Sequence, residues 1–180
     1  MPTVFSHAVA GLAIATLTRA PGALGRLALV AVLCAAVPDL DVVSLWLGVP
    51  WGHVLGHRGI THSPAFAAVL ATALTLTLFR GAGRRGHIWL ILFLATASHG
   101  VLDAMTDGGL GVTFFAPFDN TRYFFPWRPV LVSPIGIAPF FSRYGLNVLL
   151  SELMWIWVPV GMVIFGILRV KQLMKRHIKD

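Results

Sequence analysis

The sequence predicts an all-α protein, a polytopic bundle of about five short transmembrane helices. Hydrophobic residues make up 57% of the 180 residues and charged residues only 12%, whereas soluble domains are about half apolar and about a quarter charged. The mean hydropathy is +0.79, and the apolar residues fall into long runs. This balance excludes a water-soluble globule, a disordered chain and a coiled coil.

The apolar runs give the expected membrane helices in order. They cover residues 8–18, 27–37, 64–79, 88–102 and 146–168, and a proline-interrupted stretch, 129–141, is a weaker sixth candidate. Several runs are shorter than the about 20 residues that cross a bilayer, so we expect their polar neighbours at the membrane edge. No Lys or Arg precedes the first run, which predicts a retained helix rather than a secretory signal. The single cysteine, Cys34, is expected in the helix core.

The positive charges predict the orientation of the bundle. Ten of the 14 Lys and Arg residues belong to one side of this topology: Arg19, Arg26, Arg80, Arg84, Arg85, Arg169, Lys171, Lys175, Arg176 and Lys179. By the positive-inside rule this side is cytoplasmic, so the long loops, 38–63 and 103–145, and the N-terminus are expected outside. Because no repeat or linker divides the chain, we expect one domain over residues 1–170 and a basic cytoplasmic tail over residues 171–180.

Five of the seven acids and five of the seven histidines gather on the extracytoplasmic side, and only His87, His177, Glu152 and Asp180 fall outside this group. Most of its members stand at the start of the first helix, the end of the second, the start of the third and the end of the fourth, and alternating helix directions bring these four ends together. An ionisable side chain at membrane depth is costly and marks a functional site. The residues concerned are His7, Asp39, Asp41, His57, His62, His99 and Asp103.

The spacing of the last pair suits a shared ligand. His99 and Asp103 are four residues apart on a predicted helix, so both side chains project from one face, and Asp107 is expected to extend that face by another turn. In Pro38-Asp39-Leu40-Asp41 the proline is expected to end the helix. The side chains of the two aspartates then point to opposite sides of an extended backbone. One is expected to bind a metal while the other orients a neighbouring ligand.

A histidine pair precedes the third run. His57 and His62 lie on either side of a glycine turn in His57-Arg58-Gly59-Ile60-Thr61-His62. The guanidinium of Arg58 can bind a phosphate or carboxylate oxygen through two parallel hydrogen bonds. We expect Arg58 to neutralise charge that develops on a substrate.

Together these groups predict a metal centre at the extracytoplasmic membrane edge. Nitrogen and oxygen ligands without thiolate indicate Zn²⁺, with Mn²⁺ or Fe as alternatives. The seven candidate ligands His7, Asp39, Asp41, His57, His62, His99 and Asp103 are too many for one closed tetrahedral site, so two ions are favoured. Two-metal sites suit phosphate ester hydrolysis by activated water. We expect Asp39, Arg58 and Asp107 to take part in catalysis.

Several further polar residues admit two interpretations. His53 is a ligand or a solvated loop histidine, and Asp107, before two glycines, and Asp119, before Asn120, are ligands or turn residues. The loop 113–128 interleaves aromatic residues with two arginines. It is an aromatic interface belt, a lid that admits lipid to the site, or both.

Taken together, the motifs resemble a known family. Ser6-His7, Pro38-Asp39-Leu40-Asp41, the segment from His57 to Ser63, Ser98-His99-Gly100-Val101-Leu102-Asp103 and Pro117-Phe118-Asp119 are similar to motifs of the bacterial LexA-regulated, or LexA-binding, inner-membrane metal-dependent hydrolases over residues 1–170. That family is more distantly similar to the zinc-dependent phospholipase C and P1 nuclease superfamily. The resemblance implies a multi-pass protein of the bacterial inner membrane.

The resemblance also implies ligand roles. His7 corresponds to an early ligand, Asp41 or Asp39 to the first carboxylate and His57 or His62 to the next imidazole. His99 and Asp103 correspond to the pair whose carboxylate bridges metals. The sequence lacks a second histidine-and-acid pair after His99, so a three-metal centre is not expected.

The favoured function is hydrolysis of a phosphoester in a phospholipid or lipid-linked substrate. A transporter that moves a metal ion or proton is the first alternative, and a structural membrane protein with a metal that staples its loops is the second. Nucleic acid is not an expected partner despite the net charge of +7, because the largest basic cluster is predicted on the side opposite the site. The sequence does not define an oligomeric state.

Overall fold

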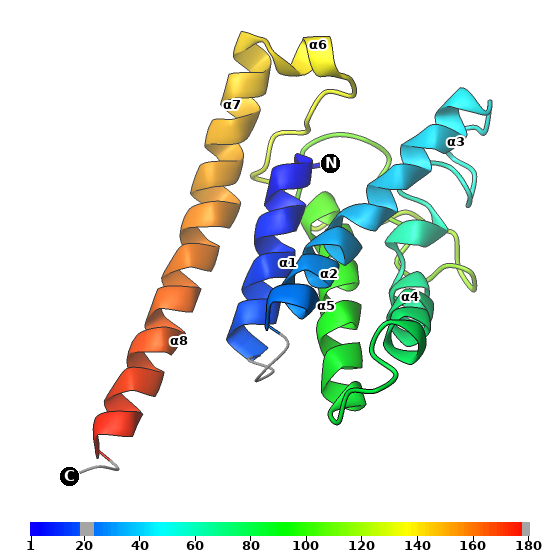
Figure 1. Ribbon diagram of the computed structural model, residues 1–180. Helices are drawn as coiled ribbons and strands as arrows, with labels where there is room; N and C mark the ends of the chain where they lie inside the picture. Colours follow the sequence, from blue (N-terminus) through cyan, green and yellow to red (C-terminus); the bar gives the residue numbers. More distant parts are fainter. Residues whose placement is uncertain (19–23, 178–180) are drawn as a thin grey trace.

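The computed structural model describes residues 1–18 and 24–177 and is all-α over these ranges, as predicted (Figure 1). The elements in chain order are α1 Val4–Thr18, α2 Leu24–Ala36, the 3₁₀-helix η1 Val37–Val42, α3 Val43–Trp46, the 3₁₀-helix η2 Ile60–His62, α4 Pro64–Thr77, α5 Arg85–Ala104, α6 Ile137–Phe140, α7 Arg143–Glu152, the π-helix η3 Leu153–Trp157 and α8 Val158–His177.

Five apolar helical segments correspond to the five predicted membrane runs. Gly25–Trp46, Arg85–Ala104 and Arg143–Met174 are long and apolar enough to cross a membrane, and Val4–Leu17 and Pro64–Thr77 are shorter apolar helices. The first and last of the long segments are composite: α2, η1 and α3 are continuous, as are α7, η3 and α8 (Figure 1). The weaker sixth candidate, 129–141, forms only the short helix α6 and is not a span.

Small side chains let α1, α2, α4 and α5 pack closely. The shared core contains Ala31, Cys34, Ala71 and Ala95 beside larger residues such as Leu92, so Cys34 is a core residue as predicted. A Cβ on Gly11 of α1 would lie 2.7 Å from the Ala31 carbonyl oxygen of α2. Close backbone approach of this kind is how helices associate within a bilayer.

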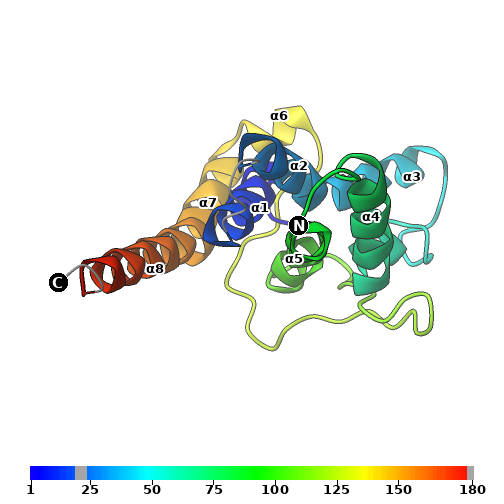
Figure 2. The same cartoon turned by 60° about the horizontal axis from the view of Figure 1, so that its bottom comes forward.

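The last helix stands partly apart from this bundle. From the α7 end α8 runs beside α1 and then extends away from the other helices (Figures 1 and 2). Only 6% of the most apolar 18-residue stretch of Arg143–Met174 is buried. Apolar side chains of this helix, such as Phe165, therefore face outward. Helix α8 continues through the expected tail boundary at residue 171. Arg19 and Lys179, used in the charge count, lie outside the described residues.

Two local expectations were wrong. Asp39 and Asp41 do not lie on extended backbone: they belong to η1, which has Pro38 in its first turn, where a missing backbone N–H costs little. With three residues per 3₁₀ turn, positions two apart point to different sides, so the two aspartates still separate. Helix α5 ends at Ala104, and Asp107 therefore does not continue its face.

Candidate metal centre

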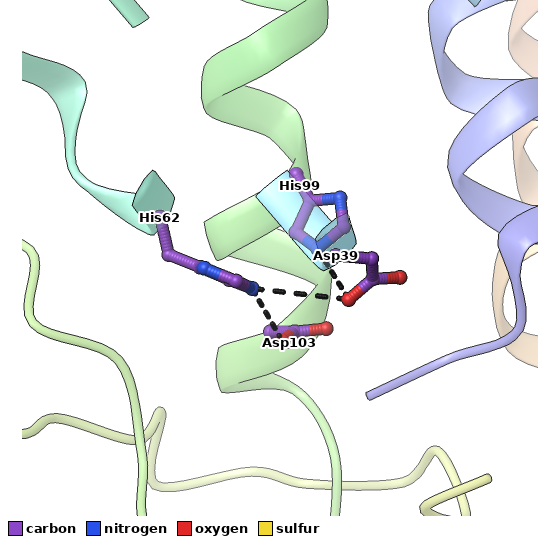
Figure 3. Close-up of side chains that lie close together, drawn as sticks. All are labelled: Asp39, His62, His99 and Asp103. Carbon is purple, nitrogen blue, oxygen red and sulfur yellow. Dashed lines mark hydrogen bonds and ion pairs between the residues drawn. The ribbon is translucent and has the colours of Figure 1, made fainter. Parts of the chain in front are cut away.

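Four chain segments bring acids and histidines together at one end of the bundle. Asp39 comes from η1, His62 from η2, and His99 and Asp103 from successive turns of α5. One ligand atom from each of these four residues lies within 4.8 Å of all the others, and Figure 3 shows their side chains directed toward one another. His7 of α1 adjoins them, with its ring stacked on that of His99 at a centroid distance of 3.6 Å.

Local sequence places His62 at this point. Ser63 caps α4 by accepting a hydrogen bond from the backbone N–H of Phe66, and Pro64 starts the helix, so the chain enters α4 directly after His62. The segment also lies against α5 because residue 100 has no side chain. A Cβ on Gly100 would be 2.5 Å from the His62 carbonyl oxygen.

The two carboxylates each present one oxygen to His7 and the other to the remaining histidines. His7 Nε2 lies 3.9 Å from Asp39 Oδ2 and 3.6 Å from Asp103 Oδ1. Asp39 Oδ1 lies 3.2 Å from His99 Nε2 and 4.0 Å from His62 Nε2, and Asp103 Oδ2 is 3.3 Å from His62 Nε2. Two ligands about 2.1 Å from one zinc ion at a tetrahedral angle are about 3.4 Å apart. The observed separations therefore suit shared metal ions.

Hydrogen bonds on the far side of two rings fix their tautomers. His99 Nδ1 is 2.6 Å from the Ala35 carbonyl oxygen, and a carbonyl only accepts, so Nδ1 carries the proton. His62 Nδ1 is 3.2 Å from Asp41 Oδ2, which also accepts. In the neutral rings both Nε2 atoms are therefore lone pairs that face carboxylate oxygens. Such contacts are repulsive unless a proton or a metal ion lies between the two atoms.

The unpaired atoms of the cluster point to the same conclusion. Both ring nitrogens of His7, Nε2 of His62 and both oxygens of Asp103 are buried and make no hydrogen bond in the described part of the chain, although Asp103 Oδ2 forms an ion pair with Arg58 Nε. Buried polar atoms are rarely left unpaired. Nitrogen and carboxylate donors in this arrangement fit Zn²⁺, Mn²⁺ or Fe, so the residues present fit the predicted metal.

Asp41 and His57 form a second group that shares His62. Asp41 Oδ1 is 2.6 Å from His57 Nδ1, while Asp41 Oδ2 accepts from the Thr61 hydroxyl at 2.6 Å and from the Arg58 backbone N–H at 3.2 Å. One atom each from Asp41, His57 and His62 also lie within 4.8 Å of one another. The Asp41 oxygens are already bonded, which makes this group suited to orienting His62.

Charge and burial act on His62, which lies outside the membrane-spanning segments. Burial alone lowers the pKa of His62, but close contacts with the carboxylates of Asp103 and Asp41 outweigh it and raise the pKa to about 9. In the metal-free protein the ring is therefore protonated at neutral pH. A metal ion at Nε2 would replace that proton.

Arg58 is buried against Asp103. Its Nε lies 3.0 Å from Asp103 Oδ2, and Nη1 and Nη2 donate at 2.9 Å to the Gly108 carbonyl and the Thr106 hydroxyl. Its backbone has φ of 62°, a conformation that non-glycine residues rarely adopt. All three guanidinium nitrogens thus have protein partners, and the expected contact with a substrate stays a prediction.

Three further candidates do not join the cluster. The exposed His53 accepts from the Leu55 backbone N–H through Nδ1. Asp107, also exposed, accepts from the Val132 backbone N–H at 2.8 Å, and Asp119 accepts from the Thr121 N–H and the Tyr123 hydroxyl. The contacts of Asp107 and Asp119 are those of turn residues, and His53 lies exposed in its loop.

Two hollows border the site. One, of about 310 Å³, is lined by His57 and Arg58 together with Trp51, Gly109, Val132 and others. The larger, of about 610 Å³, begins at Pro64, two residues after His62, and its lining is wholly apolar: Pro64, Ala65, Phe114, Phe115, Ala116, Phe118 and Phe125. Neither hollow is lined by Asp39, His62, His99 or Asp103, but the smaller one is lined by His57 and by Arg58, which pairs with Asp103.

Sequence reasoning missed two contributors. The Thr61 hydroxyl, which binds Asp41, gave no signal beyond its place between two histidines. Glu152 is fully buried and bonds the residues before His7. It was visible as an acid inside an apolar run, but its partners lie near the opposite end of the chain.

A buried group of imidazoles and carboxylates at one end of an apolar helix bundle defines a membrane protein with a candidate metal centre. Residues 1–177 match the family described as YdjM inner membrane protein. The chain is 40% identical over 170 residues to the Inner membrane protein YbcI of Escherichia coli (strain K12), which covers 93% of this chain and 97% of that protein. The chain therefore belongs to the YdjM inner membrane protein family. No solved structure matches it.

Proposed function

We propose that this protein is a metal-dependent hydrolase that cleaves a phosphoester of a phospholipid or lipid-linked molecule at the membrane edge. The observation that carries the proposal is that Nε2 of His62 and Nε2 of His99 face oxygens of Asp103 and Asp39 from separate elements of the chain. These four side chains would hold a divalent cation that takes the place of the His62 proton.

The proposed centre holds two ions, with zinc favoured and Mn or Fe as alternatives. His62, His99, Asp39 and Asp103 would hold one ion, and His7 together with the same two aspartates would hold the other. The second ion would have fewer protein ligands than the first, and an incomplete ligand set of this kind suits binding of water and substrate.

Net charge favours an anionic substrate at this centre. With neutral histidines, the three carboxylates and the Arg58 guanidinium leave the group doubly negative, and two divalent ions make it doubly positive. A bound divalent ion lowers the pKa of water and polarises a phosphoryl oxygen. A phosphoester supplies the negative charge that complements the loaded centre.

The surrounding residues hold the ligands in place. Asp41 fixes the His62 ring through Nδ1, and Arg58 fixes Asp103. Asp41 also fixes His57, which lines the smaller hollow. No partner for His57 Nε2 is found within residues 1–18 and 24–177. Since Nδ1 carries the proton that faces Asp41, Nε2 of the neutral ring has a lone pair that can accept a hydrogen bond from water or from a substrate hydroxyl.

Apolar surface beside the centre supports a lipid substrate. The larger hollow has only apolar lining residues, and Phe118 at its rim is 93% exposed. Exposed aromatic side chains suit the headgroup layer of a bilayer. The motifs resemble those of inner-membrane hydrolases and, more distantly, of the phospholipase C and P1 nuclease superfamily, and this resemblance supports the same reaction. We also propose that the site lies on the extracytoplasmic side. A reporter fused after residue 180 tests this orientation. If a reporter that is active only outside the cytoplasm is active there, the tail lies outside and the proposed orientation is wrong.

The proposal is tested by metal analysis followed by an activity screen. Detergent-purified wild type should contain two Zn, Mn or Fe per chain and hydrolyse a phospholipid or phosphodiester from a panel. His99→Ala should lose the metal and the activity, whereas His53→Ala, an exposed histidine outside the cluster, should keep both. Wild type without metal after reconstitution would refute the centre. Loaded protein inactive on every phosphoester would refute the hydrolase and leave the centre.

A further inference from the structure

A second buried acid lies where the last membrane-spanning segment changes its helical form. Glu152 ends α7, the π-helix η3 follows it, and its side chain is fully buried. Within the described ranges it forms no salt bridge, and a carboxylate at membrane depth without one needs hydrogen bonds to offset its desolvation. The metal chemistry proposed above makes no use of this residue.

Glu152 takes its hydrogen bonds from the start of α1. The Thr3 backbone N–H and hydroxyl donate to its two oxygens at 2.5 Å, and the Ser6 hydroxyl donates at 2.6 Å. The Trp157 indole N–H in turn donates to Ser6 Oγ at 2.8 Å. One carboxylate therefore receives three donors from one short segment.

The π-helix explains how Glu152 and Trp157 reach the same serine. They are five residues apart, which in an α-helix places side chains about 140° past a full turn. The π-helix closes its hydrogen bonds over five residues, so it turns more slowly and brings such positions closer to one face. The irregular turn thus joins the last span to α1 at Ser6.

The same short segment determines the place of His7. The Thr3 carbonyl accepts from the backbone N–H of Ser6 at 3.0 Å and of His7 at 3.4 Å. His7 follows Ser6 directly, is fully buried and has no hydrogen bond of its own to fix its ring. Its orientation depends on the stack against His99 and on where α1 begins.

We propose that Glu152 is a positioning residue for the metal centre, which it controls by fixing Thr3 and Ser6 so that His7 can bind the second ion. This inference rests on the metal centre of the proposed function but not on its hydrolase activity. Loss of Glu152 should act as loss of His7 does, because the first ion keeps His62 and His99 while the second loses its imidazole.

Substitutions at Glu152 separate its hydrogen bonds from its charge and volume. In Glu152→Gln the amide oxygen can accept from the Thr3 N–H, and the amide nitrogen can donate to the two hydroxyl oxygens, so the connection survives. Glu152→Leu fills a similar volume and makes none of these bonds. Lys171→Ala is the matched control: it removes the bond from Lys171 Nζ to the Leu17 carbonyl, 3.1 Å long, at the other end of the same helix pair.

The experiment measures zinc stoichiometry and affinity by chelator competition in folded, detergent-purified protein. Wild type, Glu152→Gln and Lys171→Ala should bind two ions per chain. His7→Ala, Glu152→Leu and the double variant should each bind one, with the double variant no weaker than either single one, since coupled residues are not additive. Ser6→Ala serves if Glu152→Leu does not fold, and it should weaken the second ion about 10- to 100-fold.

Two results would overturn the inference alone. In the first, folded Glu152→Leu binds both ions with wild-type affinity while His7→Ala binds one. In the second, the losses of affinity in the two single variants add in full in the double variant. Wild type that binds no zinc would instead overturn the metal centre, and this inference with it.

Discussion

Replacing Asp103 with asparagine should abolish the metal-dependent part of the protein's thermal stability. The change keeps the side-chain volume but removes the charge from a fully buried carboxylate whose oxygens face His7, His62 and Arg58. At metal concentrations 1,000 times Kd, one bound ion stabilises wild type by about 4.1 kcal/mol. For a chain of this size that corresponds to a rise in Tm of about 8–16 °C. Asp103→Asn should show almost none of this rise.

The same variant separates metal binding from the Arg58 ion pair. In a chelator, Asp103→Asn should be less stable than wild type by about 3–5 kcal/mol, because the buried guanidinium loses its charged partner. Adding Arg58→Met should recover part of that loss without restoring the response to metal. The assay is thermal unfolding of detergent-purified protein with zinc and with chelator, and His53→Ala is the control. A full zinc-dependent rise in Asp103→Asn would refute Asp103 as a ligand.

Three further predictions concern the support of the ligands. Asp41→Asn should lower metal affinity about 10- to 100-fold without changing the number of ions, because the His62 ring loses the carboxylate that orients it. Chelator competition measures the affinity, and an unchanged value would contradict the prediction. Gly100→Ala should destabilise the protein by about 1–3 kcal/mol and reduce its metal content, since the new Cβ would meet the His62 carbonyl oxygen at 2.5 Å. Thermal unfolding measures the stability and elemental analysis the metal content. A variant that matches wild type in both would count against the close approach of Gly100 and His62. Apparent metal affinity should rise with pH up to about 9, because the raised pKa of His62 means that the ion must displace a proton. Metal titrations in buffers from pH 6 to 9 measure how the affinity changes with pH. An affinity independent of pH would contradict the prediction.

The parts of the site that sequence could predict follow from helix geometry. His99 and Asp103 share a face of α5 because they are four residues apart, and α5 extends over both. The convergence of helix ends followed from alternating directions along the chain. Both inferences need only local periodicity and chain order, which a sequence contains directly.

The choice between neighbouring candidates depended on partners far away in the chain. Sequence left Asp39 and Asp41 open, and the structure separates them because a 3₁₀ turn directs Asp39 to His99 and Asp41 to His57. It suggested a substrate for Arg58, whose partner proves to be Asp103, 45 residues later in the chain. Such pairings come from tertiary packing and leave no trace in local spacing.

The distribution of polar groups along the bundle bears on the transporter alternative. A conducting path needs ligands or water at successive depths, yet the buried acids and histidines of the cluster stand at one end of α1, α2, α4 and α5. Toward the other end the same helices close on Leu27, Ile91 and Leu92, each at most 2% exposed. An ion leaving the cluster in that direction would exchange carboxylate and imidazole ligands for hydrocarbon. The arrangement therefore favours chemistry on a molecule that reaches the site from the membrane edge over passage through the bundle.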